Sequence, residues 1–187
     1  ELWVDDHLRM YARRAGWNDE FEITGSQGGS LTKEDEGGKP NKSGDVLATT
    51  DKGKRISIEV KFTDIPAGPL SERKYEAEPP DTAWSQIVEG IANRNADAGF
   101  IVFDRSNINS AIAKAIPDIG YLEGAGLVCV VDWESGRKEN LFAAYSIARA
   151  LVHMDNLNRS PEAVAALVSQ AQKVVQQIAN LHSSITK

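Results

Sequence analysis

Hydrophobic residues recur at helical spacing over positions 1–15, which predicts a helix that ends at Gly16. The apolar face of this helix is formed by Val4, Leu8, Tyr11 and Ala15. A short strand is predicted at 20–24, and a segment rich in glycine, serine and charge follows it at 25–44. Loops of that length in compact domains are usually functional or disordered, so this segment is a candidate to contact a substrate.

The segment 43–64, SGDVLATTDKGKRISIEVKFTD, predicts two strands joined by a tight turn. Gly53 can adopt the left-handed conformation that ends a three-residue hairpin loop. With such a loop, paired residue numbers sum to 104 and Asp45 lies opposite Glu59, whereas a two-residue loop would shift the register by one. Lys61 lies two residues after Glu59 and therefore shares its face. The other face is an apolar row of Ile56, Ile58, Val60 and Phe62.

Beyond the proline-rich segment 65–81, helices alternate with strongly apolar strands. A helix is predicted at 82–95, strands at 99–104 and 126–133, and a short helix between these strands at 108–116. Continuous apolar strands that alternate with helices are typical of a sheet covered on both faces. We therefore expect an α/β fold with a mixed central sheet flanked by helices.

The end of the chain predicts a helical hairpin. Its first helix has an apolar face of Leu141, Tyr145, Ala148 and Val152. Ser160 and Pro161 mark the start of the second helix, whose stripe consists of Val164, Leu167, Ala171, Val174, Ile178, Leu181 and Ile185. We divide the chain into a core at 1–135 and a hairpin at 136–187. The stripe fits packing inside the hairpin, and it also fits a homodimer or continuation into a longer chain.

Composition narrows the class of protein. The chain has 187 residues with ordinary globular proportions of hydrophobic and charged residues. No apolar run has the length of a membrane span, no signal-peptide pattern opens the chain, and Cys129 is the single cysteine, so we expect a cytoplasmic protein without disulfides. The net charge of −6 argues against a nonspecific coat of nucleic acid, but not against an enzyme whose carboxylates hold cations. The three histidines share no metal-ligand spacing.

The hairpin carries the candidate chemistry. Carboxylates of Asp45 and Glu59 that face each other across a strand pair repel, and solvation, protonation or a divalent cation would relieve the repulsion. Mg²⁺ commonly binds one or two carboxylates together with water and phosphate oxygens. Lys61 beside such an ion would orient water or stabilise negative charge, as in phosphodiester hydrolysis. The alternative is a solvated salt-bridge cluster, whose pairs contribute about 0–1 kcal/mol each.

This motif resembles that of the PD-(D/E)xK phosphodiesterase superfamily, which includes restriction endonucleases, recombination nucleases and Holliday-junction resolvases. Asp45 is followed, at the end of the next strand, by Glu59, Val60 and Lys61. Gly44 stands where the motif's name has proline, a departure that is widespread in the family.

The flanking sequence extends the resemblance over residues 1–104. Family members often begin with a helix that carries an acidic residue and ends before a glycine and an aromatic residue, and here Glu1 opens such a helix. Some members carry a glutamine on the helix after the motif, and Gln86 in WSQIVEG matches it. Gly90 stands where a tyrosine often follows.

The resemblance implies a restriction-endonuclease-like fold and a Mg²⁺-dependent deoxyribonuclease, an endonuclease rather than an exonuclease, with Mn²⁺ able to substitute. The implied metal ligands are Asp45, Glu59, the carbonyl of Val60, and Glu1. The implied catalytic residues are Asp45, Glu59, Lys61 and Gln86.

The expected substrate is nucleic acid, DNA in preference to RNA. Its expected contacts are Lys42, Lys54, Arg73 and Lys74, although basic loop residues are equally well explained by solubility. A catalytically inactive nuclease fold that binds nucleic acid or a protein partner, with assembly through the C-terminal helices, is the alternative function. For Glu1 and Gln86 the alternatives are a terminal residue favoured by the helix dipole and a solvated helix position.

Overall fold

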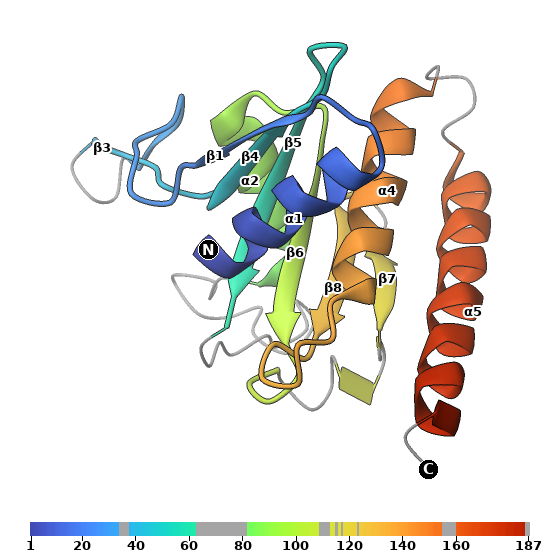
Figure 1. Cartoon of the computed structure of the whole chain (residues 1–187). Helices are drawn as coiled ribbons and strands as arrows, with labels where there is room; N and C mark the ends of the chain where they lie inside the picture. Colours follow the sequence, from blue (N-terminus) through green and yellow to red (C-terminus); the bar gives the residue numbers. More distant parts are fainter. Residues whose placement is uncertain are drawn as a thin grey trace.

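The structure is a computed structural model that describes residues 1–33, 38–62, 82–108, 113–114, 116, 118–122, 124–154 and 160–185. At 33, 179 and 181–185 only the backbone is described. These residues form an α/β structure in which a six-stranded mixed sheet lies between helices (Figure 1). The α/β class and the mixed sheet expected from the sequence are therefore confirmed, while the restriction-endonuclease-like topology stays a prediction.

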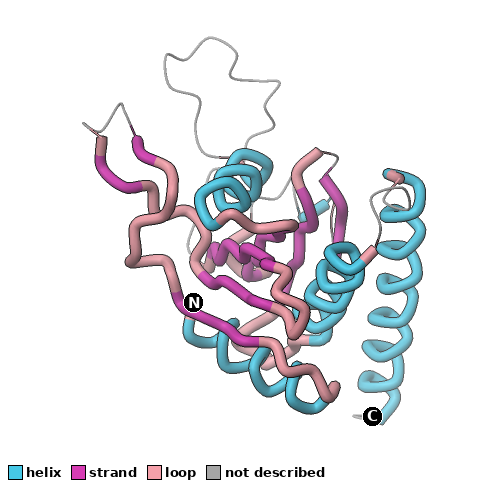
Figure 2. The backbone as a smooth tube through the Cα atoms, turned by 90° about the horizontal axis from the view of Figure 1, so that it is seen from above, coloured by secondary structure: helices cyan, strands magenta, loops and turns pink. Residues whose placement is uncertain are grey.

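The sheet has the strand order β1-β4-β5-β6-β8-β7. Its strands are β1 (Glu20–Ile23), β4 (Val46–Thr49), β5 (Arg55–Lys61), β6 (Ala98–Asp104), β7 (Ile119–Leu122) and β8 (Gly126–Val131). β5, β6 and β8 are parallel, whereas β1, β4 and β7 pair antiparallel with their neighbours. The short strands β2 (Thr32–Lys33) and β3 (Lys39–Pro40) form a separate ribbon that projects from the body (Figures 1 and 2). The carboxyl ends of the three parallel strands consequently meet at one edge.

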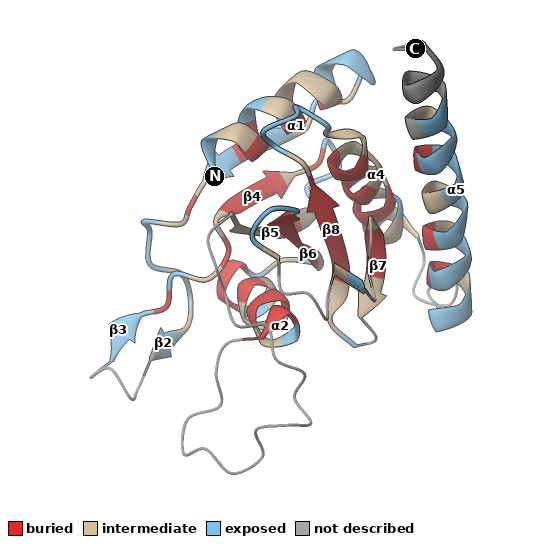
Figure 3. Cartoon of the chain, turned by 90° about the horizontal axis from the view of Figure 1, so that it is seen from below, coloured by how far each residue is buried: buried red, intermediate tan, exposed pale blue. Residues whose placement is uncertain are grey.

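Helices cover both faces of the sheet. α1 (Leu2–Arg14) and α4 (Glu139–His153) pack on one face, and α2 (Ala83–Arg94) packs on the other (Figure 3). α5 (Pro161–Ile185) lies outside them, against α4 and the edge strand β7. Among the described residues, no helix is both long and apolar enough to cross a lipid bilayer.

The helix expected at 1–15 is confirmed as α1, but its buried face differs from the predicted one. Ala15 is exposed because it follows the end of the helix, and Ala12 is buried instead. Asp5 is also buried on this face, where one of its oxygens lies 2.7 Å from Nε of Arg9. The ion pair explains how a carboxylate occupies a position that apolar spacing alone would leave to a hydrophobic residue.

The predicted hairpin register is confirmed. The β4–β5 pairs run from Val46↔Ile58 to Thr49↔Arg55, so each pair sums to 104. The turn closes with the Thr50 N–H donating to the Lys54 carbonyl at 2.8 Å, and Gly53 has a φ of +74°. Only a residue that tolerates positive φ closes this loop without strain, which is why the glycine fixed the register.

Other elements agree with their predictions, but three short strands were not predicted: β2 and β3, within the segment expected to be a loop, and β7. α2 begins after Thr82, whose hydroxyl accepts from the Ser85 N–H, and ends at Asn95 in the left-handed conformation. β6 and β8 correspond to the predicted apolar strands. The strand β7 runs antiparallel to β8 and joins it through the turn at Gly124. Most of the helix predicted at 108–116 lies outside the described residues.

At the end of the chain the apolar face predicted for α4 is confirmed, since all four of its residues are buried. α4 and α5 lie antiparallel, as the predicted hairpin requires, and α4 also belongs to the core of the sheet (Figure 1). The stripe predicted for α5 is partly wrong: Val174 is 54% exposed, and Val168 and Val175 are buried with Val164. α5 turns this face toward α4 and β7, where Nε2 of Gln172 donates to the Ile119 carbonyl.

Candidate functional site

Asp45 lies where the β4–β5 ladder ends, at the open end of the hairpin. Its N–H donates to the Ile58 carbonyl at 2.9 Å, and its own carbonyl accepts from Thr24 and Gly25 of the loop after β1. Its Oδ2 accepts from the Val60 N–H at 2.8 Å. The ladder of β4 and β5 therefore ends at the Val46–Ile58 pair, one residue short of the predicted Asp45–Glu59 pair. Beyond this end, the carboxylate of Asp45 accepts a hydrogen bond from the backbone of β5.

Glu59 and Lys61 lie on the same face of β5, as predicted from strand alternation. Glu59 is 4% exposed; its Oε2 accepts from the Gly44 N–H at 2.8 Å, and its Oε1 lies 2.5 Å from Nζ of Lys61. The Lys61 side chain is only 21% exposed. The expected alternative of a solvated surface cluster is therefore excluded for Glu59.

The electrostatics of Glu59 are unfavourable to its negative charge. Burial raises the pKa of its carboxyl above the ordinary value, and the negative charge of Asp45 adds to the rise. The ammonium of Lys61 and the N–H of Gly44 act in the opposite direction without cancelling it. A proton or a cation at this carboxylate would relieve the cost of its burial.

Glu1 brings a third carboxyl group to the site from the start of α1. A side chain at Gly25 would place its Cβ 2.5 Å from Oε1 of Glu1 and 2.8 Å from Oδ1 of Asp45. Burial, followed by the charge of Asp45, raises the pKa of Glu1. Gly25 thus leaves the space in which Glu1 and Asp45 approach each other, although Glu1 itself is exposed at the N-terminal cap of α1, as the alternative interpretation expects.

Gly44 positions Asp45 with a backbone conformation that proline cannot adopt. Its φ is +89°, whereas proline is restricted to about −65°. A Cβ at Gly44 would also lie 2.8 Å from the side chains of both Arg94 and Ser57. The departure from the motif's proline therefore has a local structural cause in this chain.

Arg94, which sequence reasoning did not single out, holds the loops behind the site. It is 5% exposed, and its Nε donates to the Gly44 carbonyl at 3.1 Å. Its Nη2 donates to the carbonyls of Thr24, Gln27 and Lys42. One guanidinium on α2 thereby ties the loop after β1 to the segment that leads into Asp45, and burial lowers its pKa.

Asn93 performs a similar task one residue earlier. It is 1% exposed, and its Nδ2 donates to the carbonyls of Asn41 and Ser43, both at 2.9 Å. Its Oδ1 accepts from the Leu31 N–H at 3.0 Å. The only sequence signal for Asn93 and Arg94 is their position at the end of a helix, where polar residues are by default assigned to the solvent side.

α2 approaches the hairpin closely, which accounts for the glycine at position 90. A Cβ at Gly90 would lie 2.9 Å from Oγ of Ser57 and 3.5 Å from the backbone of Gly44. A larger residue would push α2 away from β5. Gln86 lies one turn earlier on the same helix and is 8% exposed, so it is not the solvated residue of the alternative interpretation.

The structure does not bring all predicted contact residues together. Lys42 is exposed two residues before Gly44, close to the site. Lys54 lies at the closed end of the hairpin, where its Nζ is 2.9 Å from Oδ1 of Asp97. Arg73 and Lys74 lie outside the described residues.

The residues present suit a hard divalent cation that completes its shell with other ligands. Among the described residues, no group of three or more His, Cys, Asp or Glu forms a metal cage on its own. Mg²⁺ does not need one, because it commonly takes one or two carboxylates and fills the remaining positions with water and phosphate oxygens. Asp45 and Glu59 supply those carboxylates, in surroundings that favour neutralisation of Glu59. The role of the Val60 carbonyl as a ligand stays a prediction.

Comparison with known proteins names no family for this chain. No protein-family model matches it, and no match is found among curated proteins or solved structures. Any assignment of function must therefore be argued from the site itself.

Proposed function

We propose that the chain is a Mg²⁺-dependent nuclease that hydrolyses phosphodiester bonds in DNA. The observation that carries this proposal is the buried Glu59, with a raised pKa, between the carboxylate of Asp45 and the ammonium of Lys61. A buried acidic group that lacks sufficient positive charge, next to one lysine, supports cation-assisted attack on a phosphodiester.

Each residue has a distinct task in this proposal. Asp45 and Glu59 hold the cation, which supplies Lewis-acid polarisation of a phosphate oxygen and a lowered pKa of water when it is bound. Lys61 orients the attacking water and stabilises charge that develops on the phosphate; its contact with Glu59 restrains the direction of the ammonium. Glu1 acts through its closeness to Asp45, whose charge raises the pKa of Glu1. Gln86, on the buried face of α2, is assigned to positioning.

The test is a cleavage assay on closed circular DNA, linear duplex and single strands with Mg²⁺, Mn²⁺ or EDTA. We expect Lys61→Ala to slow cleavage by roughly 10²–10⁴-fold, the usual range for loss of a proton-transfer or charge-stabilising group. Lys173→Ala, on the exposed side of α5, is the matched lysine control and should cleave like the unaltered protein. Thermal unfolding of both variants verifies folding. Cleavage by Lys61→Ala at the unaltered rate, or cleavage in EDTA, would refute the assignment.

The endonuclease part of the proposal has its own readout in the same assay. An endonuclease nicks or linearises closed circular DNA, which has no ends. Degradation restricted to linear substrates would replace the endonuclease with an exonuclease and leave the catalytic residues unchanged.

One observation favours the alternative of a binding module that does not cut. Both oxygens of Glu59 already have protein partners, Lys61 and the Gly44 N–H. In that case Glu59 would be a structural acid. Calorimetric titration with Mn²⁺ separates the two functions: the nuclease binds the ion with heat that Asp45→Asn abolishes, whereas the module binds DNA without taking up the ion.

A further inference from the structure

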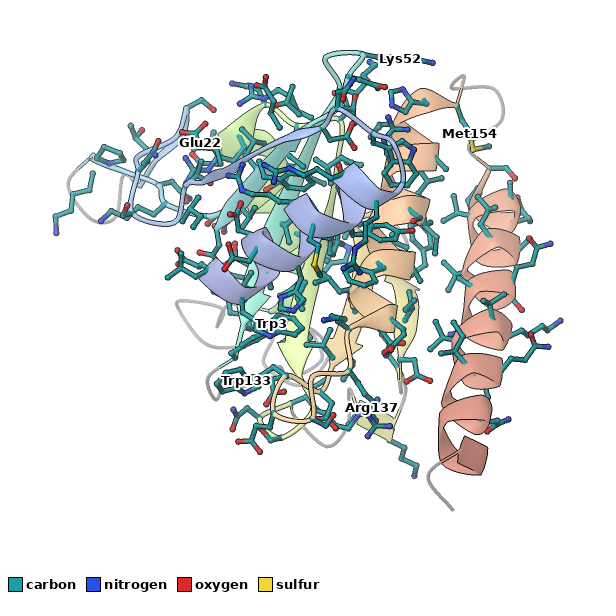
Figure 4. All side chains as sticks on the ribbon, in the orientation of Figure 1. Trp3, Glu22, Lys52, Trp133, Arg137 and Met154 are labelled. Carbon is teal, nitrogen blue, oxygen red and sulfur yellow. The ribbon has the colours of Figure 1, made fainter. Side chains whose placement is uncertain are left out.

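Three aromatic side chains form a continuous strip at the carboxyl ends of the parallel strands. Trp3 comes from α1, Phe62 follows β5 directly, and Trp133 follows β8. The ring centroids of Trp3 and Phe62 are 5.7 Å apart, and those of Phe62 and Trp133 are 6.1 Å apart. Figure 4 shows Trp3 and Trp133 on the same side of the molecule, below the start of α1. We call these three residues the aromatic strip.

The aromatic strip begins next to two residues of the candidate site. Phe62 is the neighbour of Lys61 in sequence, and Trp3 lies two residues after Glu1. Lys61 and Phe62 point to opposite faces of the sheet at the end of the same strand, with Phe62 on the side from which α1 approaches. A chain of nucleotides whose phosphate is at the site would therefore reach the strip by passing around the carboxyl end of β5.

The strip contains an exposed tryptophan on a fixed backbone. Trp133 is 44% exposed, although its ring would gain free energy from burial. Its backbone N–H donates to Oδ1 of Asp104, a residue at the end of β6 that is 1% exposed. From the same loop, Nδ2 of Asn107 donates to the Phe62 carbonyl at 2.7 Å. One loop after β6 thus holds the backbone under two of the three rings.

We propose that the aromatic strip stacks unpaired bases, so that the substrate of the site is single-stranded DNA. This inference rests on the proposed nuclease function and adds the class of substrate to it. Bases within a duplex already stack on their neighbours, and only unpaired bases have free faces for Trp133, the exposed ring of the strip. Since the chain carries a net charge of −6, attraction of phosphates supplies little nonspecific affinity, and stacking becomes the main source of binding free energy.

The first experiment measures binding in EDTA, where the proposed metal-dependent cleavage is absent. Fluorescence anisotropy compares a labelled single strand with the duplex of the same sequence, using the full chain. We expect Trp133→Leu to weaken single-strand binding by roughly 5- to 50-fold, because stacking on one aromatic residue is lost. Trp133→Phe keeps a ring and should restore most of the affinity. Trp84→Leu removes another exposed tryptophan, on α2 at the opposite face, and should leave the affinity unchanged.

The results distinguish this inference from the proposed function. If the protein cleaves DNA but Trp133→Leu binds single strands like the unaltered chain, the inference is overturned and the nuclease stands. Tighter binding of duplex than of single strand would overturn it equally. If no DNA is cleaved with any metal while Trp133→Leu weakens single-strand binding and Trp133→Phe restores it, the nuclease fails and the ligand class stands. Thermal unfolding of each variant guards against loss of fold.

Discussion

The two ends of the β4–β5 hairpin differ in how their carboxylates are paired with positive charge. At the closed end, the side chain of Asp19 is fully buried and one of its oxygens lies 2.8 Å from Nε of Arg149, while an oxygen of Asp51 lies 2.8 Å from Nη2 of the same guanidinium. The Tyr145 hydroxyl also donates to Asp19, and burial with this hydrogen bond raises the pKa of Tyr145.

At the open end, the carboxyl groups of Glu1, Asp45 and Glu59 lie near one another, and Lys61 contacts Glu59. Arg94 is close, but it donates its hydrogen bonds to backbone carbonyls. At the closed end both carboxylates contact the guanidinium directly, as in an ordinary ion-pair network. At the open end the pKa values of Glu1 and Glu59 stay raised despite the nearby positive charge, which is what marks a candidate cation site.

The largest expected difference between the two ends lies in activity. Asp45→Asn removes a cation-binding carboxylate and should slow DNA cleavage by roughly 10³-fold, which corresponds to about 4 kcal/mol of activation free energy. The free energy of unfolding should not fall, because the site then carries less repulsion. A cleavage assay with Mg²⁺ and a urea titration of the same variant measure both quantities. Unchanged cleavage would remove Asp45 from the catalytic residues.

At the closed end the main effect should be on stability. Arg149→Met leaves Asp19 buried without a cation and removes a guanidinium that lies 4.4 Å from the Trp17 ring centroid, so we expect a loss of about 3 kcal/mol. Arg137→Met, at an ion pair whose arginine side chain is 64% exposed, is the control and should cost roughly 0–1 kcal/mol. Urea unfolding measures both changes. Equal losses in the two variants would contradict the contrast between a buried network and a surface pair.

Mg²⁺ should stabilise the open end specifically. A ligand at one hundred times its dissociation constant adds about 2.7 kcal/mol to the free energy of unfolding. Differential scanning fluorimetry should show a rise in Tm with Mg²⁺ in the unaltered chain and in Arg137→Met, and no rise in Asp45→Asn. A rise of equal size in Asp45→Asn would place the ion elsewhere.

The smallest effect concerns pH. Because the native pKa of Glu59 is raised, its ionisation costs native stability as pH increases above the ordinary carboxyl value. Glu59→Gln avoids that cost, so without metal its free energy of unfolding should exceed that of the unaltered chain at neutral pH, and this advantage should disappear as the pH falls below the ordinary carboxyl pKa. Urea titrations at several pH values test the difference. An advantage that grows toward low pH would have the wrong sign.

The hairpin could be predicted well from the sequence because its turn and its strand faces depend on neighbouring residues. Gly53 fixes the turn, and alternation then places Glu59 and Lys61 on one face. The position of Asp45 is different, since it depends on the conformation of Gly44 and on the hydrogen bonds of Arg94, which lies fifty residues away in sequence. No periodicity or short motif encodes such a contact.

The buried faces of the helices could likewise be predicted only in part from the sequence. The apolar stripe of α4 was predicted because a single stripe exists there. On α5, stripes through Val174 and through Val175 are both compatible with helical spacing, and packing on α4 and β7 selects the second. On α2, the buried polar residues Gln86, Asn93 and Arg94 continue the stripe of Ala83, Ile87 and Gly90, and only their polarity argues for a solvent face. The partner of a helix, not its own sequence, decides these cases.

The contact between α5 and β7 has a consequence for handling the protein. β7 is an outer strand of the sheet, and the hydrogen bond from Gln172 to Ile119 together with the body of α5 shields it. The opposite outer strand, β1, is short and presents exposed Glu20 and Glu22. Charged side chains thus discourage strand addition at the β1 edge of the sheet, whereas α5 does so at the β7 edge. A protein truncated before α5 would expose the edge strand β7. We expect such a protein to precipitate through β-pairing between molecules.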